Sequence, residues 1–484
     1  MNDETKVEVD LKKPEVTNNE QMVDVKPGVT TVVIPSKPVE QKTEEAPKEK
    51  PAATITNTEF AITIVKSVTG MGCLGIPCAM AQMGIIPMTI MYLLVTAANI
   101  INTYYLVDAN DGIKRSKLPL KSDMKIENDY ANLMYQLFGM WGYYIFLVFL
   151  FLTVYGVMLG SMISMFEFIA NLPYPENFLG GFKTRSIIMY LFTTVVTYVL
   201  CLIRDTKKLY FVSWFGIFTL VLSYLVVIIY GLCTINIKFD ASLLFSRSTM
   251  GFLSNLGTAP YTLGYNFCFL TYYVRPRLLS HPQKQVERAQ QPRTLATTKK
   301  SIFAVCLVYL LFSVSATVIY GSVRDADGNL AIPANLVKAL PPSSVCGAGI
   351  YALMWLSCVC SMPVLLASTA EVLEKNCPQG DRSFFVRDKG RLLSRLVQIL
   401  LLAVVSYLVP FFGEVVNIYI LSHSQSRLLH PTRRIRLRRH LHPDPRRHPL
   451  LRRTAHFALG AAAFVLMVVA TYFSTVTLIQ NMRG

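Results

Sequence analysis

Long apolar stretches alternate with polar connections over most of the chain. Ten of these stretches have about the 20 residues that an α-helix needs to cross a bilayer, and we number them as crossings one to ten. They lie at approximately residues 60–84, 86–107, 142–169, 186–203, 209–233, 251–273, 301–321, 346–369, 393–412 and 457–479. The pattern predicts an all-α polytopic membrane protein with about 10 crossings, embedded in the lipid bilayer.

Crossing one contains a helix-breaking motif, TGMGCLGIP, at residues 69–77. Gly70, Gly72 and Gly75 each weaken a helix, and Pro77 removes a backbone donor and clashes with the preceding turn. Glycines that let a second helix approach are usually spaced by four, unlike these. A broken helix is tolerated in hydrocarbon only where its freed backbone groups face protein, water or a ligand, so the break is a candidate binding site.

Crossing six has a similar interruption. Residues 257–264 read GTAPYTLG and place Pro260 and two glycines inside an apolar stretch. Crossings one and six occupy corresponding positions if the chain consists of two halves of five helices. The pair therefore predicts an inverted-repeat transporter, with its substrate site between broken helices one and six.

Composition and charge narrow the class further. With 52% hydrophobic residues over 484 positions, the chain is too apolar for a soluble enzyme of this size. The connections after even-numbered crossings carry far more Lys and Arg than those after odd-numbered crossings, which predicts a cytosolic N-terminus. Since connecting loops explain the formal net charge of +17, no nucleic-acid partner is expected. The apolar stretches contain no paired carboxylates, metal-ligand cluster or activated nucleophile, so neither an enzyme nor a metal or other cofactor is predicted.

Two polar segments flank the apolar region. Residues 1–56 are rich in Lys, Glu, Pro and Thr without periodicity and are predicted to form a disordered cytosolic tail. Residues 421–456 form an anomalous segment before the last helix at 457–484, and residues 423–456 hold 10 Arg and 6 of the 7 His. This run cannot cross a membrane. A sequence error, a frameshifted allele and a divergent isoform all remain open as its origin.

Several polar side chains inside the crossings are candidates for function. Lys66 is the only Lys or Arg in crossing one and precedes the break by one turn. An ammonium at that depth is costly unless it is paired, neutralised or hydrated, which makes Lys66 a functional candidate. Alternatively, it extends to the cytosolic interface. Crossing eight carries a stripe of hydroxyl groups that either faces the bundle interior or a cation site, or bonds back to its own helix. The stripe consists of Ser357, Ser361, Ser368 and Thr369.

Two of the ten cysteines, Cys233 and Cys346, fall at the outer membrane face in this topology. They are predicted either to approach one another and form a disulfide or to remain unpaired buried thiols.

The motif GMGCLGIPCA at residues 70–79 resembles the first-helix motif of the amino acid/auxin permease family, a branch of the amino acid-polyamine-organocation transporters. Further motifs match in the same order and extend the resemblance over residues 57–420. They are LIRDTKKL at 202–209 followed by Ser213 and Gly216, IPANLVKALP at 332–341, MPVL at 362–365 and LVPFFG at 408–413. The resemblance implies a LeuT-type bundle with 5+5 inverted repeats that moves amino acids on a proton or sodium gradient.

The resemblance also implies roles for individual residues. The substrate carboxylate would bind backbone N–H groups of crossing one, and crossing six would shape the side-chain pocket. The residues concerned are Thr69, Gly70, Met71, Gly72 and Cys73 in crossing one, and Tyr261, Gly264 and Tyr265 in crossing six. Lys66 looks like the lysine of proton-coupled members, which implies proton-coupled, sodium-independent symport with Lys66 as the coupling residue.

Two features depart from the family pattern. Some proton-coupled members carry a carboxylate near the position of Gly264, and the expected tenth of eleven helices is replaced by the Arg/His-rich segment. An amino acid sensor or receptor with the same fold, or an inactive divergent or frameshifted form, therefore remains an alternative. The plasma membrane and the vacuolar or lysosomal membrane are both possible addresses.

Overall fold

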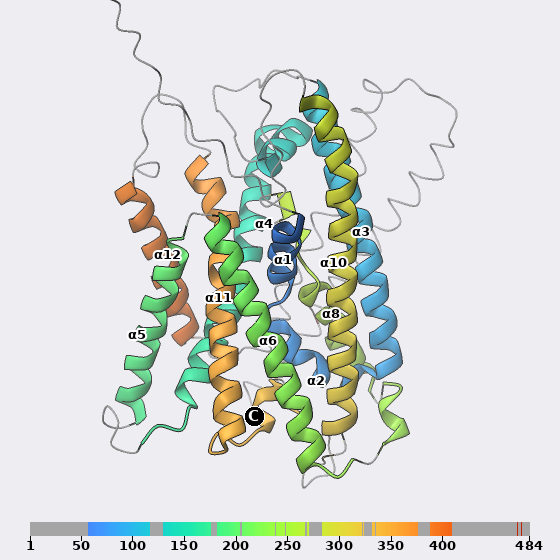
Figure 1. Cartoon of the computed structure of the whole chain (residues 1–484), viewed down its shortest axis with the longest axis vertical. Helices are drawn as coiled ribbons and strands as arrows, with labels where there is room; N and C mark the ends of the chain where they lie inside the picture. The colour runs from blue at the N-terminus through green and yellow to red at the C-terminus, as the bar shows by residue number, and fades with distance from the viewer. Residues whose placement is uncertain are drawn as a thin grey trace, which may run out of the picture. The chain divides into compact units, whose positions relative to one another are not determined.

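The computed structural model is helical in the part of the chain that it describes, with no strand among those residues (Figure 1). The described residues are 57–116, 129–175, 182–203, 206–237, 239–246, 248–266, 269–270, 283–321, 323, 332–333, 335–375, 388–408, 472 and 476. All of them belong to the second of the two units into which the chain divides, Thr54–Gly484.

The helices follow the order of the apolar stretches. They are α1 Asn57–Val68, α2 Ile76–Met83, α3 Ile85–Ser116, α4 Asp129–Ala170, α5 Phe182–Cys201, α6 Thr206–Thr234, α7 Thr249–Ser254, α8 Thr258–Thr262, α10 Gln283–Tyr320, α11 Val345–Lys375 and α12 Asp388–Leu408. Three short 3₁₀ helices lie between them: η1 Met71–Gly75, η2 Ala241–Leu243 and η3 Leu336–Ala339.

Seven of the described helices are long and apolar enough to cross a membrane, namely α3, α4, α5, α6, α10, α11 and α12. The bent pair formed by α1 and α2 passes the same test as one span, which raises the number within the described residues to as many as eight. The prediction of an all-helical polytopic membrane protein is confirmed. The predicted tail at 1–56 and the Arg/His-rich segment at 421–456 lie outside the described residues, as does crossing ten apart from Tyr472 and Val476.

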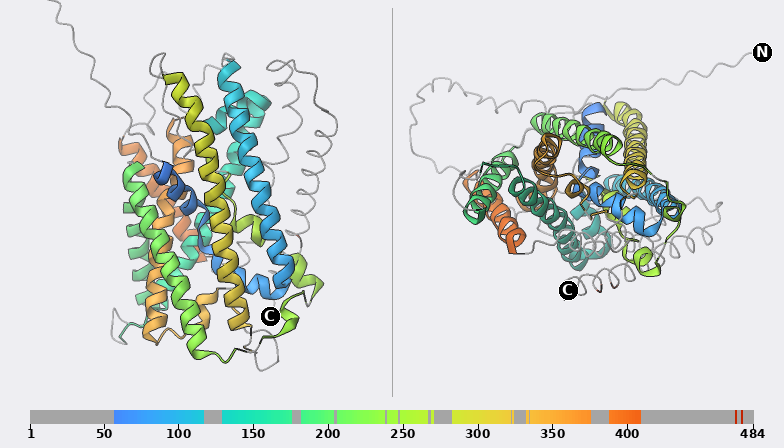
Figure 2. Two further views of the ribbon diagram at one scale, coloured as in Figure 1. Left: turned by 45° about the vertical axis from the view of Figure 1, so that its right-hand side comes forward. Right: turned by 90° about the horizontal axis from the view of Figure 1, so that it is seen from below.

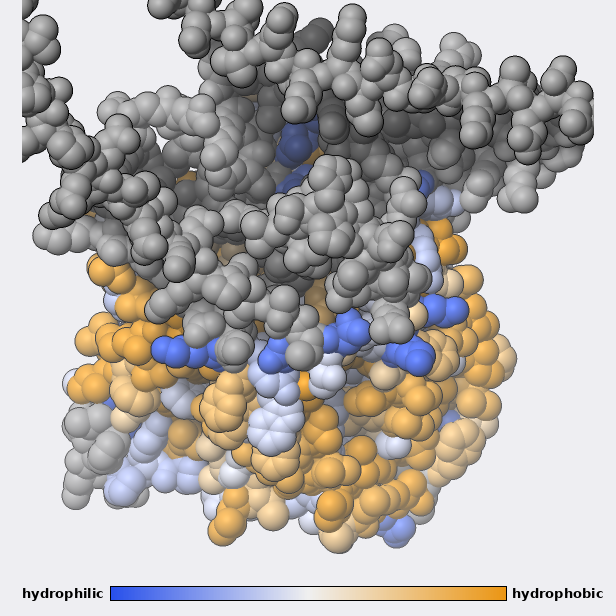
Figure 3. Space-filling model, turned by 45° about the horizontal axis from the view of Figure 1, so that its top comes forward, coloured by the Kyte–Doolittle hydropathy of each residue, from blue (hydrophilic) through white to orange (hydrophobic). Residues whose placement is uncertain are grey.

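The helices pack around α1, which lies inside the bundle against α6, α10 and α11 (Figures 1 and 2). α11 packs against α4, α5 and α6. Of its most apolar stretch, 72% is buried, the largest share among the seven spans. Apolar side chains cover much of the described surface that Figure 3 shows. Many large apolar side chains are exposed on the described helices, among them Leu94, Leu191 and Leu401. Such a surface is expected where lipid rather than water surrounds the protein.

Crossing one consists of two helices joined by a 3₁₀ turn. α1 ends at Val68, η1 follows, and the two parts Asn57–Val68 and Gly72–Met83 are bent by 49°. Pro77 lies in the first turn of α2, where its missing N–H removes no hydrogen bond within the helix. The proline therefore begins α2 and does not interrupt it.

The start of crossing six consists of the short helices α7 and α8. Ser248 caps α7 by accepting a hydrogen bond from the backbone N–H of Gly251. α8 begins after Gly257 and ends after Thr262, with Pro260 in its first turn. Both helices are too short to cross a bilayer alone.

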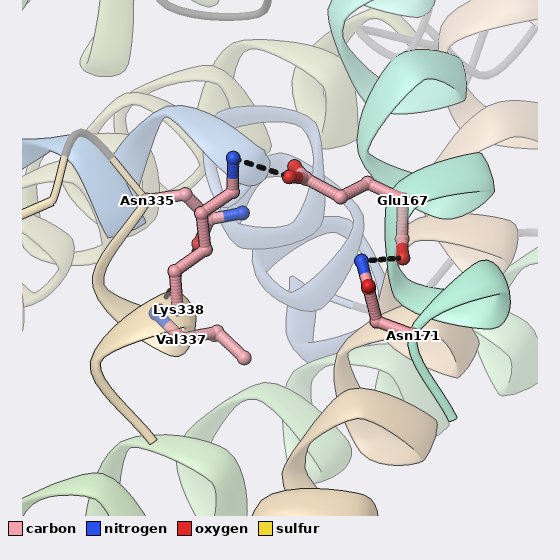
Figure 4. Close-up of polar contacts among 5 residues, drawn as sticks. All are labelled: Glu167, Asn171, Asn335, Val337 and Lys338. Carbon is pink, nitrogen blue, oxygen red and sulfur yellow. Dashed lines mark hydrogen bonds and ion pairs between the residues drawn. The ribbon is translucent and has the colours of Figure 1, made fainter. Parts of the chain in front are cut away.

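An ion pair between Lys338 and Glu167 joins η3 to the end of α4 (Figure 4). Asn335 caps η3, since its side-chain oxygen accepts from the backbone N–H of Val337 at 3.3 Å. On α4, the Asn171 amide donates to the Glu167 carbonyl at 2.8 Å. Leu336 and Val337 are fully buried, so apolar packing as well as the ion pair holds η3 in place.

Cys233 and Cys346 are free thiols in the structure, and both are exposed. The end of α6 and the start of α11 do lie at the same end of the bundle (Figure 1). The predicted disulfide is nevertheless not formed here, and the thiols are not buried either. Each residue lies at a helix end, where its side chain is exposed.

Candidate functional site

The break in crossing one has an irregular backbone around Gly70. The N–H of Thr69 completes the last turn of α1 by donating to the carbonyl of Val65 at 2.8 Å. Gly70 adopts an extended conformation, with no side chain capping η1. The Cys73 thiol donates to the Gly70 carbonyl at 3.0 Å. The Thr69 hydroxyl oxygen is buried without a hydrogen-bond partner among the described residues.

This break lies directly against α8. A Cβ atom on Gly72 would lie 2.6 Å from Cε1 of Tyr261 and 2.9 Å from Cγ2 of Thr262. Real Cβ contacts are not that short, so only glycine permits the approach. The structure thus brings two predicted site residues, Gly72 and Tyr261, together from crossings one and six.

The other two predicted residues of crossing six are Tyr265, which lies beside α3, and Gly264, which lies in the turn after α8. The hydroxyl of fully buried Tyr265 is hydrogen-bonded to that of Thr103 in α3. The N–H of Gly264 donates to the Tyr261 carbonyl at 3.2 Å. The α3 side chain of Asn99 donates to the Leu263 carbonyl at 2.8 Å. The chain after α8 is therefore held by α3.

Three tyrosines near the breaks were not predicted from the sequence. Tyr309 in α10 donates to the Val68 carbonyl at the end of α1, at 3.3 Å. Tyr92 in α3 is hydrogen-bonded to Thr262 at 2.6 Å. Tyr224 in α6 lies beside the Cys73 thiol. The chain has 24 tyrosines, and nothing in their local sequence distinguishes these three.

Lys66 is buried where α1, α6 and α11 meet, with an exposed fraction of 2%. Its Nζ donates to the carbonyl of Ser357 at 3.1 Å and to the Ser357 hydroxyl at 3.2 Å. That hydroxyl donates in turn to the Gly216 carbonyl in α6 at 2.9 Å. The ammonium nitrogen of Lys66 is thus hydrogen-bonded inside the bundle, and both of its acceptors, the carbonyl and the hydroxyl of Ser357, are neutral.

The hydroxyl stripe of crossing eight divides into two kinds of contact. Ser361, Ser368 and Thr369 donate to carbonyls of their own helix, those of Ser357, Leu365 and Leu366. Ser357 alone among the four donates to another helix. Ser361, Ser368 and Thr369 therefore follow the second alternative drawn from the sequence, whereas Ser357 faces the bundle interior, where it contacts Lys66 and α6.

No group of three or more His, Cys, Asp or Glu side chains suited to a metal ion occurs among the described residues. Lys66 and the hydroxyl, thiol and backbone groups around the break provide a polar interior for hydrogen bonding.

These observations define a class of protein: a helical bundle that crosses the membrane several times, with an irregular, polar break inside its first span. Residues 53–419 match the family model described as transmembrane amino acid transporter protein, and the chain belongs to this family. No individually curated protein matches the chain. The resemblance drawn from the sequence motifs is confirmed, and the family consists of transporters rather than enzymes.

Proposed function

We propose that the protein is a secondary active transporter that carries amino acids by proton-coupled symport. The substrate binds between the broken helices of crossings one and six, in a LeuT-type bundle of 5+5 inverted repeats. The N-terminus lies in the cytosol, and the membrane is the plasma membrane or that of a vacuole or lysosome. The family match supports amino acids as the substrate.

Three features support the position of the substrate site. The two parts of crossing one are bent by 49° around η1, and Gly72 permits close contact between η1 and Tyr261 of α8. The buried Thr69 hydroxyl has no partner among the described residues, although buried polar groups are almost always hydrogen-bonded. The N–H groups of Thr69 and Gly70 already donate to the carbonyls of Val65 and Val68. We therefore place the substrate carboxylate at the backbone of residues 71–73, near the Thr69 hydroxyl, where N–H groups at the start of a helical segment favour an anion.

The single observation that supports proton coupling is the environment of Lys66. Its Nζ is buried and bonded only to the neutral oxygens of Ser357, with no carboxylate beside it in the part of the chain that the structure describes. An intramembrane charge without a counter-charge is costly and usually functional. We assign Lys66 the coupling role, in which its amine releases and regains a proton as the bundle opens to each side.

Lys66 also argues against a sodium ion between α1, α6 and α11. Sodium would compete with the Lys66 ammonium for the same Ser357 oxygens. Two cations bound to the same oxygens would repel one another, and no carboxylate lies between them in the described part of the chain. While it is protonated, the ammonium occupies the position beside the Ser357 oxygens that a sodium ion would need, and we propose that sodium is not required.

The test is uptake of labelled amino acids into proteoliposomes, with an inward proton gradient or none, and with sodium or potassium outside. We expect uptake that follows the proton gradient without sodium, and a Lys66→Ala protein that loses this pH dependence. Lys338→Ala is the matched control, because Lys338 is 51% exposed at η3 and should retain it.

The alternatives give different results in the same assay. Binding of an amino acid without uptake would favour a sensor or receptor. Failure of both binding and uptake would favour an inactive divergent or frameshifted form. Sodium-dependent uptake, or full pH dependence in Lys66→Ala, would refute the coupling role.

A further inference from the structure

Tyr224 is a buried tyrosine of α6 whose ring is held firmly but whose hydroxyl is unpaired. The ring stacks on Phe312 of α10 with centroids 4.0 Å apart and an interplanar angle of 15°. The residue is 3% exposed, and its hydroxyl has no hydrogen-bond partner among the described residues. Burying such a group without a partner costs free energy, and native proteins contain few examples.

The neighbouring tyrosines differ from Tyr224 in this respect. Tyr92, Tyr265 and Tyr309 are equally buried, and each hydroxyl has a partner, respectively Thr262, Thr103 and the Val68 carbonyl. Among these four buried tyrosines, Tyr224 is the one whose hydroxyl lacks a partner in the described part of the chain.

The group beside the Tyr224 hydroxyl belongs to the break in crossing one. The Cys73 thiol of η1 lies close enough to interact with it through sulfur, a weak acceptor, but the hydroxyl still lacks a hydrogen bond of good geometry. That thiol already donates its proton to the Gly70 carbonyl at 3.0 Å. The Thr69 hydroxyl, just before η1, is the second buried hydroxyl at this break without a partner. Two hydroxyls without a hydrogen-bond partner, one from α6 and one from the residue that follows α1, thus lie at the same break.

We propose that the Tyr224 hydroxyl hydrogen-bonds to the bound amino acid, which makes Tyr224 a residue that determines affinity and specificity from α6. This inference rests on the proposed amino acid site at the break. The stacked ring fixes the hydroxyl position before the substrate arrives, so little side-chain freedom is lost on binding. The hydroxyl both donates and accepts, so it can serve a carboxylate, an ammonium group or a polar side chain.

The experiment compares Tyr224→Phe with Tyr309→Phe in the purified full-length protein. Thermal unfolding is measured for the empty protein and with each standard amino acid in turn. Since the Tyr224 hydroxyl has no partner in the empty protein, Tyr224→Phe should keep or raise its melting temperature. Loss of one hydrogen bond should weaken the affinity for the best amino acid about tenfold.

Tyr309→Phe is the matched control, because the same oxygen is removed from a tyrosine that does have a partner. The empty Tyr309→Phe protein should melt at a lower temperature than wild type, unlike Tyr224→Phe. A purely structural role for the Tyr224 hydroxyl would give the two variants the same behaviour.

Two results would overturn the inference, and they are distinguishable. If an amino acid stabilises wild type and Tyr224→Phe with equal affinity, only the role of Tyr224 fails. If no amino acid stabilises wild type, both this role and the proposed function fail. In the first case, a lower melting temperature of empty Tyr224→Phe would assign the hydroxyl to the fold.

Discussion

Two buried polar junctions hold the helices near the breaks, and they differ in charge. At the first, Lys66 of α1 bonds Ser357 of α11, which bonds the Gly216 carbonyl of α6. At the second, α3 meets the chain after α8 through Asn99, Thr103, Tyr265 and Asn266. The first contains an ammonium with neutral acceptors, and the second pairs neutral donors with neutral acceptors.

The difference indicates different roles. A network of neutral, satisfied groups makes a junction specific and rigid, at little cost in desolvation. A buried charge without a counter-charge adds a large cost and is poorly suited to holding helices together. We therefore expect changes at the Lys66 junction to alter transport and its pH dependence, and changes at the α3 junction to alter stability.

The largest expected effect comes from Gly216→Ala, which reaches Lys66 without altering it. A Cβ atom on residue 216 would lie 2.7 Å from Cε and 2.9 Å from Nζ of Lys66, and 2.8 Å from the Cβ of Cys360. Neighbouring atoms must shift, and overpacking of this kind costs about 1–3 kcal/mol. The end of the Lys66 side chain is the more flexible neighbour, so we expect its contact with Ser357 to be lost. Proton-driven uptake should fall at least about tenfold, as measured in proteoliposomes at equal protein content.

Gly349→Ala is the control for this change, since it also replaces a helical glycine by alanine. Gly349 lies in α11, and a Cβ atom there would have nothing within 4 Å. Uptake by Gly349→Ala should match wild type. Equal uptake by the two variants would show that Lys66 needs neither its present position nor its contact with Ser357.

The sequence predicted the first junction only in part, for a physical reason. Lys66 was found because a single charge inside an apolar stretch is conspicuous, and Ser357 because hydroxyls recur along crossing eight. Their contact spans 291 positions of the chain and depends on packing of α1 against α11, which no local pattern encodes. The space left by Gly216 likewise becomes visible only with Lys66 beside it.

Elsewhere in the molecule, too, local sequence patterns predicted the elements but not the contacts between them. Apolar stretches of spanning length predicted the long helices, because length and hydropathy alone decide whether a helix suits a bilayer. The buried Tyr224 was not recognised, since a tyrosine in an apolar helix carries no local sign that its hydroxyl lies beside Cys73. The disulfide between Cys233 and Cys346 was inferred from topology alone, and the thiols are free.

A smaller effect, confined to stability, is expected for Asn99→Leu at the neutral junction. The change keeps the branched shape of the side chain, with bulkier methyl groups, but removes the donor to the Leu263 carbonyl and the acceptor for the Asn266 amide. Leaving such buried groups unpaired costs about 1–3 kcal/mol. The melting temperature of the purified protein should fall, while the pH dependence of the remaining uptake should stay as in wild type.

The double change Asn99→Leu with Asn266→Leu separates bonding from packing at this junction. Replacing both partners by apolar groups of similar size is less costly than leaving one unpaired. The double variant should therefore be more stable than the sum of the two single effects predicts. A pH profile that changes in Asn99→Leu would contradict the division of roles between the two junctions.

The smallest effect is expected where opposite charges do pair, at Glu167 and Lys338 (Figure 4). Their side chains are 22% and 51% exposed, so water and salt screen the pair, and a contact of this kind contributes about 0–1 kcal/mol. Glu167→Gln keeps the shape of the side chain and should lower the free energy of unfolding by no more than about 1 kcal/mol. High salt should remove most of that difference.

Because buried Leu336 and Val337 also anchor η3, the segment should stay in place when the charge is lost. A double-mutant cycle with Lys338→Gln measures the pair alone, and a coupling well above this range that resists salt would show that this ion pair, like Lys66, is shielded from water.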